Sequence, residues 1–155
     1  MREVRLAGLA DSPDSFAALW ADEAALPDDA WKGRAEACAE GGPAAAFVAV
    51  ENGDGCGLAI GIPLAGEPLS VELNGLWVAP AERRKGTARA LVEAVCAWAR
   101  ERRALSVVLE VTETSRAAIA LYEALGFAGV SEASCGARRA AARRMEKPLQ
   151  VLIER

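Results

Sequence analysis

Apolar residues recur with a helical period in four stretches of the chain. From Gly86 to about Arg102, apolar side chains fall three and four positions apart and charged side chains take the other side, which predicts a helix with one face on a sheet. Comparable spacing predicts helices over about 13–25, 31–40 and 115–125. We therefore expect four helices, the longest in the second half of the chain.

Short apolar runs between these helices predict strands. Ala46–Val50 and Cys56–Leu64 flank Asn52-Gly53, a hairpin signal because Asn and Gly tolerate positive φ. Ser70–Val78 and Leu105–Val111 are two further runs. Additional strands are expected around Val4 and Leu6, over 127–130 and over about 143–152. This order of strands and helices is typical of an α+β protein with a mixed sheet.

Length and composition fit one folded domain. The chain has 155 residues, of which 52% are hydrophobic and 26% charged, so we expect a single domain over 1–155 rather than a disordered chain. Its longest uncharged run, Gly55–Gly66, is too short to span a bilayer, and residues 1–11 lack the apolar core of a signal peptide. We expect no membrane partner.

Charge and residue usage exclude several kinds of chemistry. Lys and Arg number 18 against 22 Asp and Glu, and a net charge of −4 disfavours a general nucleic-acid surface. The absence of histidine excludes His-dependent triads and most zinc enzymes. The four cysteines form no CxxC pair, so we expect reduced thiols, a cytoplasmic protein and no metal.

The segment Val78–Ala88 carries the strongest chemical signal. It joins a strand end, a basic loop and a helix start, where unsatisfied backbone N–H groups and the helix dipole favour an anion. Gly86 lacks a side chain, so a pyrophosphate can approach the backbone closely. A solvated basic turn is the alternative interpretation. The segment matches neither the Walker nor the Rossmann glycine pattern.

Two motifs in this half of the chain resemble those of the GNAT superfamily of N-acetyltransferases. Arg83-x-x-Gly86-x-Ala88 is similar to its R/Q-x-x-G-x-G/A acetyl-CoA signature, and Ala118–Phe127 resembles its second motif. The resemblance implies a mixed, twisted sheet of about seven strands flanked by helices. It also implies two splayed parallel strands that form the acetyl-CoA cleft, and direct acetyl transfer to a primary amine.

The resemblance also implies which residues bind acetyl-CoA. Backbone groups on the last residues of the strand would pair with the pantetheine arm, and the loop that follows would bind the pyrophosphate. Ser115 stands where the second motif usually has asparagine, and serine has a shorter reach. The expected cofactor-binding residues are Leu76, Trp77, Val78, Arg83, Arg84, Lys85, Gly86, Thr87, Ala88 and Ser115.

Tyr122, the single tyrosine of the chain, stands where the family has its general acid. A phenol is neutral at pH 7 and can donate a hydrogen bond to the departing thiolate. Without the resemblance, Tyr122 reads as a core aromatic with its hydroxyl at the rim.

Two glutamates compete for the role of general base. Glu72 shares a strand face with Asn74, and family members often carry a glutamate there. Glu110 interrupts an otherwise apolar strand, where an unpaired charge is costly, and its segment resembles the bacterial protein N-terminal acetyltransferases. We favour Glu110 slightly; for both, an ordinary ion pair with arginine is the alternative.

The acceptor stays open at this stage. Phe16, Trp20 and Trp31 stand where the superfamily builds its acceptor wall, although large apolar residues at helical spacing are more often core. A basic cluster near the C-terminus is interpreted as a solvated strand edge rather than a site for an acidic acceptor; it comprises Arg138, Arg139, Arg143 and Arg144.

Three broader alternatives also stay open. The acceptor is either a protein N-terminus or a small-molecule amine. The chain is either a monomer or a homodimer. A non-catalytic acyl-CoA-binding or sensing domain would keep the basic loop but would not require Tyr122 or either glutamate.

Overall fold

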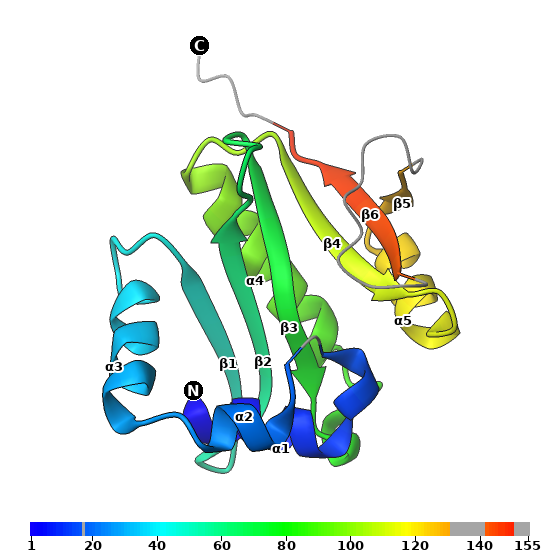
Figure 1. Ribbon diagram of the computed structural model, residues 1–155. Helices are drawn as coiled ribbons and strands as arrows, with labels where there is room; N and C mark the ends of the chain where they lie inside the picture. Colours follow the sequence, from blue (N-terminus) through cyan, green and yellow to red (C-terminus); the bar gives the residue numbers. More distant parts are fainter. Residues whose placement is uncertain (17, 131–141, 151–155) are drawn as a thin grey trace.

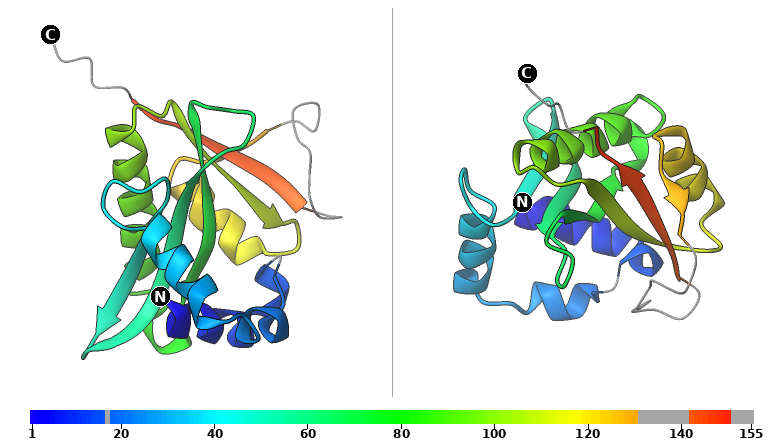
Figure 2. Two further views of the ribbon diagram at one scale, coloured as in Figure 1. Left: turned by 60° about the vertical axis from the view of Figure 1, so that its left-hand side comes forward. Right: turned by 90° about the horizontal axis from the view of Figure 1, so that it is seen from above.

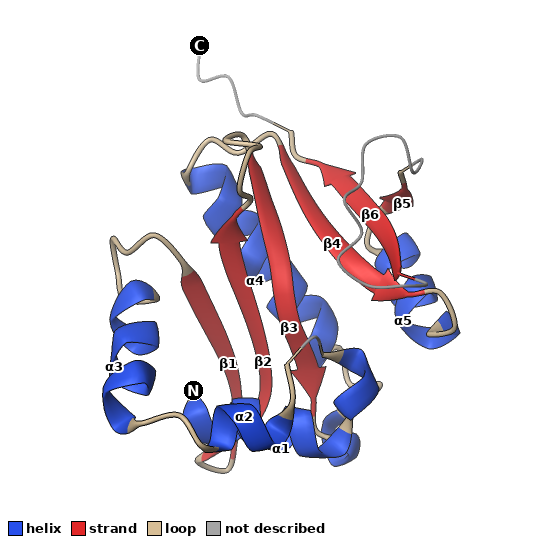
Figure 3. Ribbon diagram, in the orientation of Figure 1, coloured by secondary structure: helices blue, strands red, loops and turns tan. Residues whose placement is uncertain are grey.

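The computed structural model describes residues 1–16, 18–130 and 142–150. Within these ranges the strands form one mixed sheet in the order β1-β2-β3-β4-β6-β5 (Figures 1 and 3). The elements are α1 (Arg2–Asp11), η1 (Pro13–Ser15), α2 (Trp20–Ala24), α3 (Asp28–Ala37), β1 (Ala45–Glu51), β2 (Asp54–Pro63), β3 (Ser70–Val78), η2 (Pro80–Glu82), α4 (Thr87–Glu101), β4 (Ser106–Thr112), α5 (Arg116–Ala124), β5 (Ala128–Gly129) and β6 (Ala142–Pro148). The expected α+β class is confirmed, with six strands in the described residues rather than about seven.

The strand expected at the N-terminus is wrong, because the segment is the helix α1. Its buried residues are Val4, Gly8 and Leu9, and Val4 and Gly8 lie four positions apart, which is helical spacing. They pack with Leu58 and Trp77 on one face of the sheet. The missing strand accounts for the lower strand count.

The helix expected over 13–25 is also wrong. Pro13 opens the short 3-10 turn η1, Phe16 has an extended backbone, and a helix resumes only at Trp20. Phe16 is buried, whereas the side chains of Leu19 and Trp20 are 64% and 50% exposed. These three residues therefore do not share one packed face.

The β1–β2 hairpin forms as predicted. The two strands pair antiparallel, and Asn52 and Gly53 in the turn have φ values of 51° and 86°. Two successive residues with positive φ match the right-handed twist of a hairpin.

The main core lies between the sheet and the helices α4 and α5, on the face opposite α1 (Figure 2). The buried face of α4 includes Val92, Val95 and Cys96. A Cβ at Gly61 of β2 would lie 3.1 Å from the ring of Trp98, so glycine lets the helix approach the strand closely. Tyr122 and Met145 belong to the same core.

The sheet divides between β3 and β4. These parallel strands pair only over Ser70–Glu72 and Ser106–Val108, as far as the described residues show. Beyond these positions β3 stays with β2 and β4 stays with β6, so the two strands diverge toward their C-terminal ends (Figure 1). The expectation of splayed parallel strands agrees with this register.

Candidate functional site

The diverging part of β3 exposes one backbone edge. Trp77 and Val78 pair with Leu58 and Gly57 of β2, while past Glu72 the edge toward β4 has no strand neighbour in the described chain. An unpaired edge presents backbone N–H and C=O groups to an extended partner. Of these groups, the carbonyl of Val78 already accepts a hydrogen bond of 2.9 Å from Nε of Arg83.

A β-bulge lies on β3 in this diverging part. Leu58 pairs with Trp77 and Ile60 with Asn74, so Gly75 and Leu76 oppose the single residue Ala59. Gly75 has a φ of 63°, which favours glycine. A bulge interrupts the regular hydrogen bonding and leaves a backbone group without its usual partner.

The N-terminus of α4 follows directly after β3 and η2. Gly86 occupies its N-cap with a φ of 86°, and no side chain of the described residues caps the helix. The backbone N–H groups of residues 84–89 donate no hydrogen bond among the described residues. Arg84 also has a positive φ, 62°, and such backbone conformations turn successive N–H groups toward an anion.

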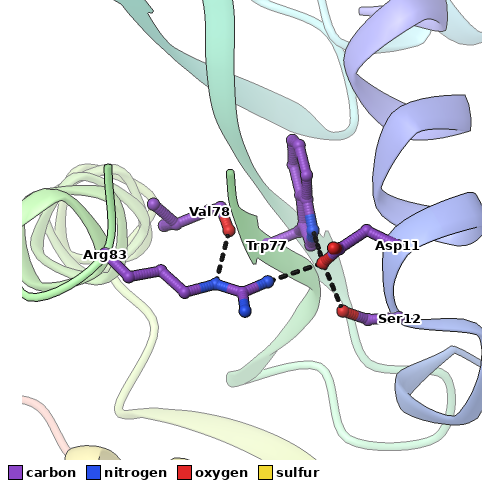
Figure 4. A network of polar contacts seen from close by, with 5 residues as sticks. All are labelled: Asp11, Ser12, Trp77, Val78 and Arg83. Carbon is purple, nitrogen blue, oxygen red and sulfur yellow. Dashed lines mark hydrogen bonds and ion pairs between the residues drawn. The ribbon is translucent and has the colours of Figure 1, made fainter. Parts of the chain in front are cut away.

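The basic side chains of this loop differ in what they contact. Arg84 is exposed, and Lys85 lies 3.3 Å from the carboxylate of Glu82 on the same loop. Arg83 donates from Nε to Val78 and from Nη2 to Oδ2 of Asp11, the latter over 2.6 Å (Figure 4). The guanidinium of Arg83 is thus held by protein groups.

Asp11 is a functional-site neighbour that the sequence analysis missed. Its Oδ2 also accepts hydrogen bonds from Nε1 of Trp77 at 2.9 Å and from Ser12 at 2.7 Å. The hydrogen bond from Trp77, with those from Ser12 and Arg83, holds the pKa of Asp11 below its usual value. No local sequence signal links Asp11 to residues so far along the chain.

Tyr122 lies on the buried face of α5. Its ring meets that of Phe127 edge to face at 5.7 Å between centroids, and its hydroxyl has no hydrogen-bond partner in the part of the chain described. Burial raises the pKa of Tyr122 to about 12. The phenol therefore stays protonated at any physiological pH.

Glu72 and Glu110 project from the same face of the sheet. Their neighbours Val71 and Leu109 belong to the core beside α4 and α5, so alternation places both glutamates on the opposite face. Glu72 is half-buried, whereas Glu110 is exposed. The expectation that Glu110 carries a buried charge is wrong, because this position of β4 faces away from the core.

The interpretation of Arg144 as a solvated strand edge is also wrong. Strand β6 lies between β4 and β5, and Arg144 donates two hydrogen bonds to Glu67, at 2.7 and 2.8 Å, with only 12% of its side chain exposed. Because Glu67 precedes β3, this ion pair links the two parts of the divided sheet. Arg143 is half-buried on β6, and Arg138, Arg139 and Cys135 lie outside the described residues.

The buried carboxylate of Glu23 links the helices that precede β1. Glu23 is 6% exposed and accepts two hydrogen bonds of 3.1 Å from Arg5, and Arg34 lies 3.2 Å away. Arg5 stacks over Phe16 at 4.9 Å, and the ring of Trp31 lies 4.9 Å from Arg34.

The residues expected in the acceptor wall differ in their burial. Phe16 and Trp31 are buried side chains, whereas Trp20 is half-exposed.

Ser115 is the N-cap of α5, and its side chain makes no capping hydrogen bond. Its backbone N–H donates to the carbonyl of Thr112 at 2.9 Å, which ties the start of α5 to the end of β4. Among the described residues no group of three or more Cys, Asp or Glu side chains is placed to hold a metal ion. Nor does any described helix combine the length and apolar character needed to cross a membrane.

Comparisons with known proteins agree with this geometry. The chain is 38% identical over 84 residues to the mouse protein named probable N-acetyltransferase family 8 member 5, a match covering 52% of this chain and 37% of that protein's length. The structure resembles the ribosomal-protein-S18-alanine N-acetyltransferase from Escherichia coli, with a TM-score of 0.59, 29% identity and 76% of each chain covered.

A second solved structure, nourseothricin acetyltransferase, gives a TM-score of 0.60 with 29% identity, covering 70% of this chain and 66% of that one. The model of the acetyltransferase (GNAT) family matches residues 10–127, which include β3, the loop before α4 and the helix that carries Tyr122. The chain belongs to the GNAT acetyltransferase family.

Proposed function

We propose that this chain is an acetyl-CoA-dependent N-acetyltransferase that transfers acetyl directly to a primary amine. The observation that carries the proposal is that the unpaired edge of β3 leads straight to the uncapped N-terminus of α4. The edge of β3 suits an extended arm that contains amides, and the N-terminus of α4 suits a pyrophosphate. Acetyl-CoA has both groups in this order: its pantetheine arm contains two amides and is joined at one end to the pyrophosphate.

The donor is bound mainly by backbone groups in this proposal. The pantetheine arm lies along Leu76, Trp77 and Val78, and the pyrophosphate accepts hydrogen bonds from the amides of residues 84–88. Gly86 leaves room for the phosphate because, among the described residues beyond its own turn, no atom lies within 4 Å of the position its Cβ would take. Thr87 and Ala88 are half-buried in the first turn of α4, and Ser115 makes a further polar contact.

Tyr122 stabilises the leaving group. The amine attacks the carbonyl carbon, the C–S bond breaks, and negative charge develops on sulfur. A thiol has an ordinary pKa of about 8.5, well below the value of about 12 for Tyr122. This difference favours a hydrogen bond donated by the phenol to the thiolate over complete proton transfer.

A carboxylate accepts the proton that the amine loses. Glu110 and Glu72 both stand on the face of the sheet opposite α4. Glu110 is exposed, and Glu72 is half-buried beside Val108. We propose Glu110 as the base and keep Glu72 as the alternative, each acting directly or through a water molecule.

The acceptor is proposed at the level of class. The names of the two solved structures point to different acceptors: an alanine of ribosomal protein S18 in one, and nourseothricin in the other. The carboxylates of Glu72 and Glu110, on the face of the sheet opposite α4, suit a positively charged amine of either kind.

Release of free thiol from acetyl-CoA tests the proposal directly. The assay uses short peptides with free N-termini and a matched set of small amines, with N-acetylated peptides as controls. We expect thiol release with one class and none with the blocked peptides. Donor binding without release across both classes would instead support a non-catalytic acyl-CoA-binding domain.

A further inference from the structure

Asp11 gathers three hydrogen bonds on one carboxylate oxygen. Its Oδ2 accepts from Ser12 at 2.7 Å, from Nε1 of Trp77 at 2.9 Å and from Nη2 of Arg83 at 2.6 Å (Figure 4). Trp77 is at the end of β3, and Arg83 is in the loop before α4. The C-terminal end of α1 is thereby attached to both parts of the donor site.

The Trp77 side of this network is closely packed. A Cβ at Gly8 of α1 would lie 3.0 Å from Cγ of Trp77, so the helix backbone rests against the indole. The indole is buried, and Asp11 satisfies its single N–H donor. Asp11 and Gly8 therefore hold Trp77, and with it the last residues of β3, against α1.

The Arg83 side determines where the loop before α4 begins its turn. Nε of Arg83 donates to the carbonyl of Val78 while Nη2 donates to Asp11. A guanidinium is planar, and two hydrogen bonds from different edges of it leave little freedom to rotate. The next residues are Arg84, with positive φ, and the segment leading to Gly86, so a fixed Arg83 places the free amides that follow.

We propose that Asp11 is a positioning residue for the acyl donor: it holds Arg83 and Trp77 and thereby places the anion-binding amides of residues 84–88 next to the free edge of β3. The inference rests on the proposed function, because it assigns Asp11 to that donor site. Asp11 acts through its two partners and has no contact of its own with the donor. Arg83 contributes through the loop position rather than by pairing with phosphate.

The test compares donor affinity with acceptor affinity in the full chain. Acetyl-CoA affinity is measured by calorimetry, and the KM for each substrate is measured by thiol release, for Asp11→Ala, Asp11→Asn, Arg83→Met and the double variant Asp11→Ala/Arg83→Met. Asp14→Ala is the matched control, since Asp14 is an exposed carboxylate of η1 with no ion pair in the described chain.

We expect Asp11→Ala to weaken acetyl-CoA binding about tenfold, within the range of coupling between contacting residues. The KM for the acceptor stays within about twofold in this variant, and Asp14→Ala behaves as the unmodified chain. The double variant is no weaker than the weaker of its two single variants, because both substitutions break the same connection.

Asp11→Asn keeps the shape of the side chain and removes its charge, so it replaces Asp11→Ala in the binding test if that variant does not fold. We expect it to weaken donor binding less than Asp11→Ala does, but measurably. Donor affinity equal to that of Asp14→Ala in a folded Asp11 variant would overturn the positioning role, and so would equal losses for donor and acceptor. Failure of the unmodified chain to bind acetyl-CoA would overturn the proposed function itself, and this inference with it.

Discussion

Tyr122 tests the proposed chemistry at the scale of one residue. Burial raises its pKa to about 12, so the phenol is a hydrogen-bond donor at neutral pH. Tyr122→Phe keeps the ring that packs on Phe127 and removes only the hydroxyl. We expect kcat to fall roughly 100-fold, the lower end of the usual cost of removing one hydrogen-bond donor to the charge that develops in the transition state.

The same variant separates catalysis from binding. Acetyl-CoA affinity, measured by calorimetry, is expected to stay within about twofold, because in the proposed binding mode the donor contacts backbone groups of other elements. An unchanged kcat in Tyr122→Phe would remove the hydroxyl from the mechanism.

Glu23 gives a prediction about stability and pH. Burial alone raises the pKa of this carboxyl, but the hydrogen bonds and charges of Arg5 and Arg34 outweigh burial and leave the pKa below its ordinary value of 4.5. A carboxyl with a lowered pKa in the folded state stabilises the fold above 4.5, and this stabilisation is lost as the pH falls through the lowered value.

Glu23→Gln is therefore expected to lower the free energy of unfolding by about 1.5–3 kcal/mol at neutral pH, the usual worth of hydrogen bonds to a charged group. Urea unfolding across the acid range measures the difference from the unmodified chain, which is expected to shrink below pH 4.5. A difference that stays constant down to strongly acid pH would contradict the account of this ion pair.

Some contacts of single residues can be predicted from the sequence and others cannot. The loop Arg83–Ala88 is recognisable because its chemistry is local: small residues and free amides lie next to each other in the chain. The partners of Arg83 and Trp77 are not recognisable, because Asp11 lies far away in sequence and exposed aspartates are common. Arg144 and Glu110 were misjudged for a related reason, since only the strand order shows that β6 is not an edge strand, and only the packing of the core shows which face of β4 is buried.

At the scale of elements, the bulge on β3 is a critical feature. Gly75 has a φ of 63°, and a Cβ there would lie 2.8 Å from Nη1 of Arg5. Arg5 cannot move freely, because Glu23 accepts two of its hydrogen bonds and Phe16 lies under its guanidinium. Gly75→Ala thus adds both backbone strain and a contact with a held side chain.

Gly66→Ala is the matched control for this substitution, because Gly66 has a φ of 82° and nothing within 4 Å of its Cβ position. We expect both variants to be less stable than the unmodified chain, by about 1 kcal/mol for Gly66→Ala. Gly75→Ala is expected to lose roughly 1–3 kcal/mol more, as is usual for overpacking. Thermal unfolding measures both, and equal losses would show that Arg5 does not constrain the bulge.

The elements themselves were predicted with uneven success. The hairpin, β3, α4, β4 and α5 follow the sequence closely, because a turn signal or a regular period defines each of them. The first 25 residues did not, since Val4 and Leu6 lie two positions apart, which fits a strand pattern better than a helical one. Packing against Trp77 stabilises a helix in this segment instead. Such a tertiary contact cannot be recognised from the local sequence.

At the scale of the whole molecule, the split sheet is the feature on which the proposed donor site depends. Three register pairs join β3 to β4, and the ion pair between Glu67 and Arg144 links the two parts again. On the other side, α1 attaches to β3 and to the start of the α4 loop through Asp11. The proposed donor site lies where α1, β3 and the loop before α4 meet. The two short motifs that resemble those of the family predict the same place from the sequence alone.

The central claim is that acetyl-CoA binds with its pyrophosphate at the N-terminus of α4. Calorimetric titration of acetyl-CoA into the unmodified chain, Gly86→Glu and Gly53→Glu tests it most directly. Gly53 has the same φ of 86° and the same open surroundings, but it lies in the β1–β2 hairpin. The two variants therefore add the same side chain and the same charge to the same backbone conformation.

We expect the unmodified chain and Gly53→Glu to bind acetyl-CoA with equal affinity, and Gly86→Glu to show no measurable binding while remaining folded. The introduced carboxylate would occupy the phosphate position and repel the donor. Equal affinity in all three proteins, or no binding by the unmodified chain, would contradict the assignment of this loop.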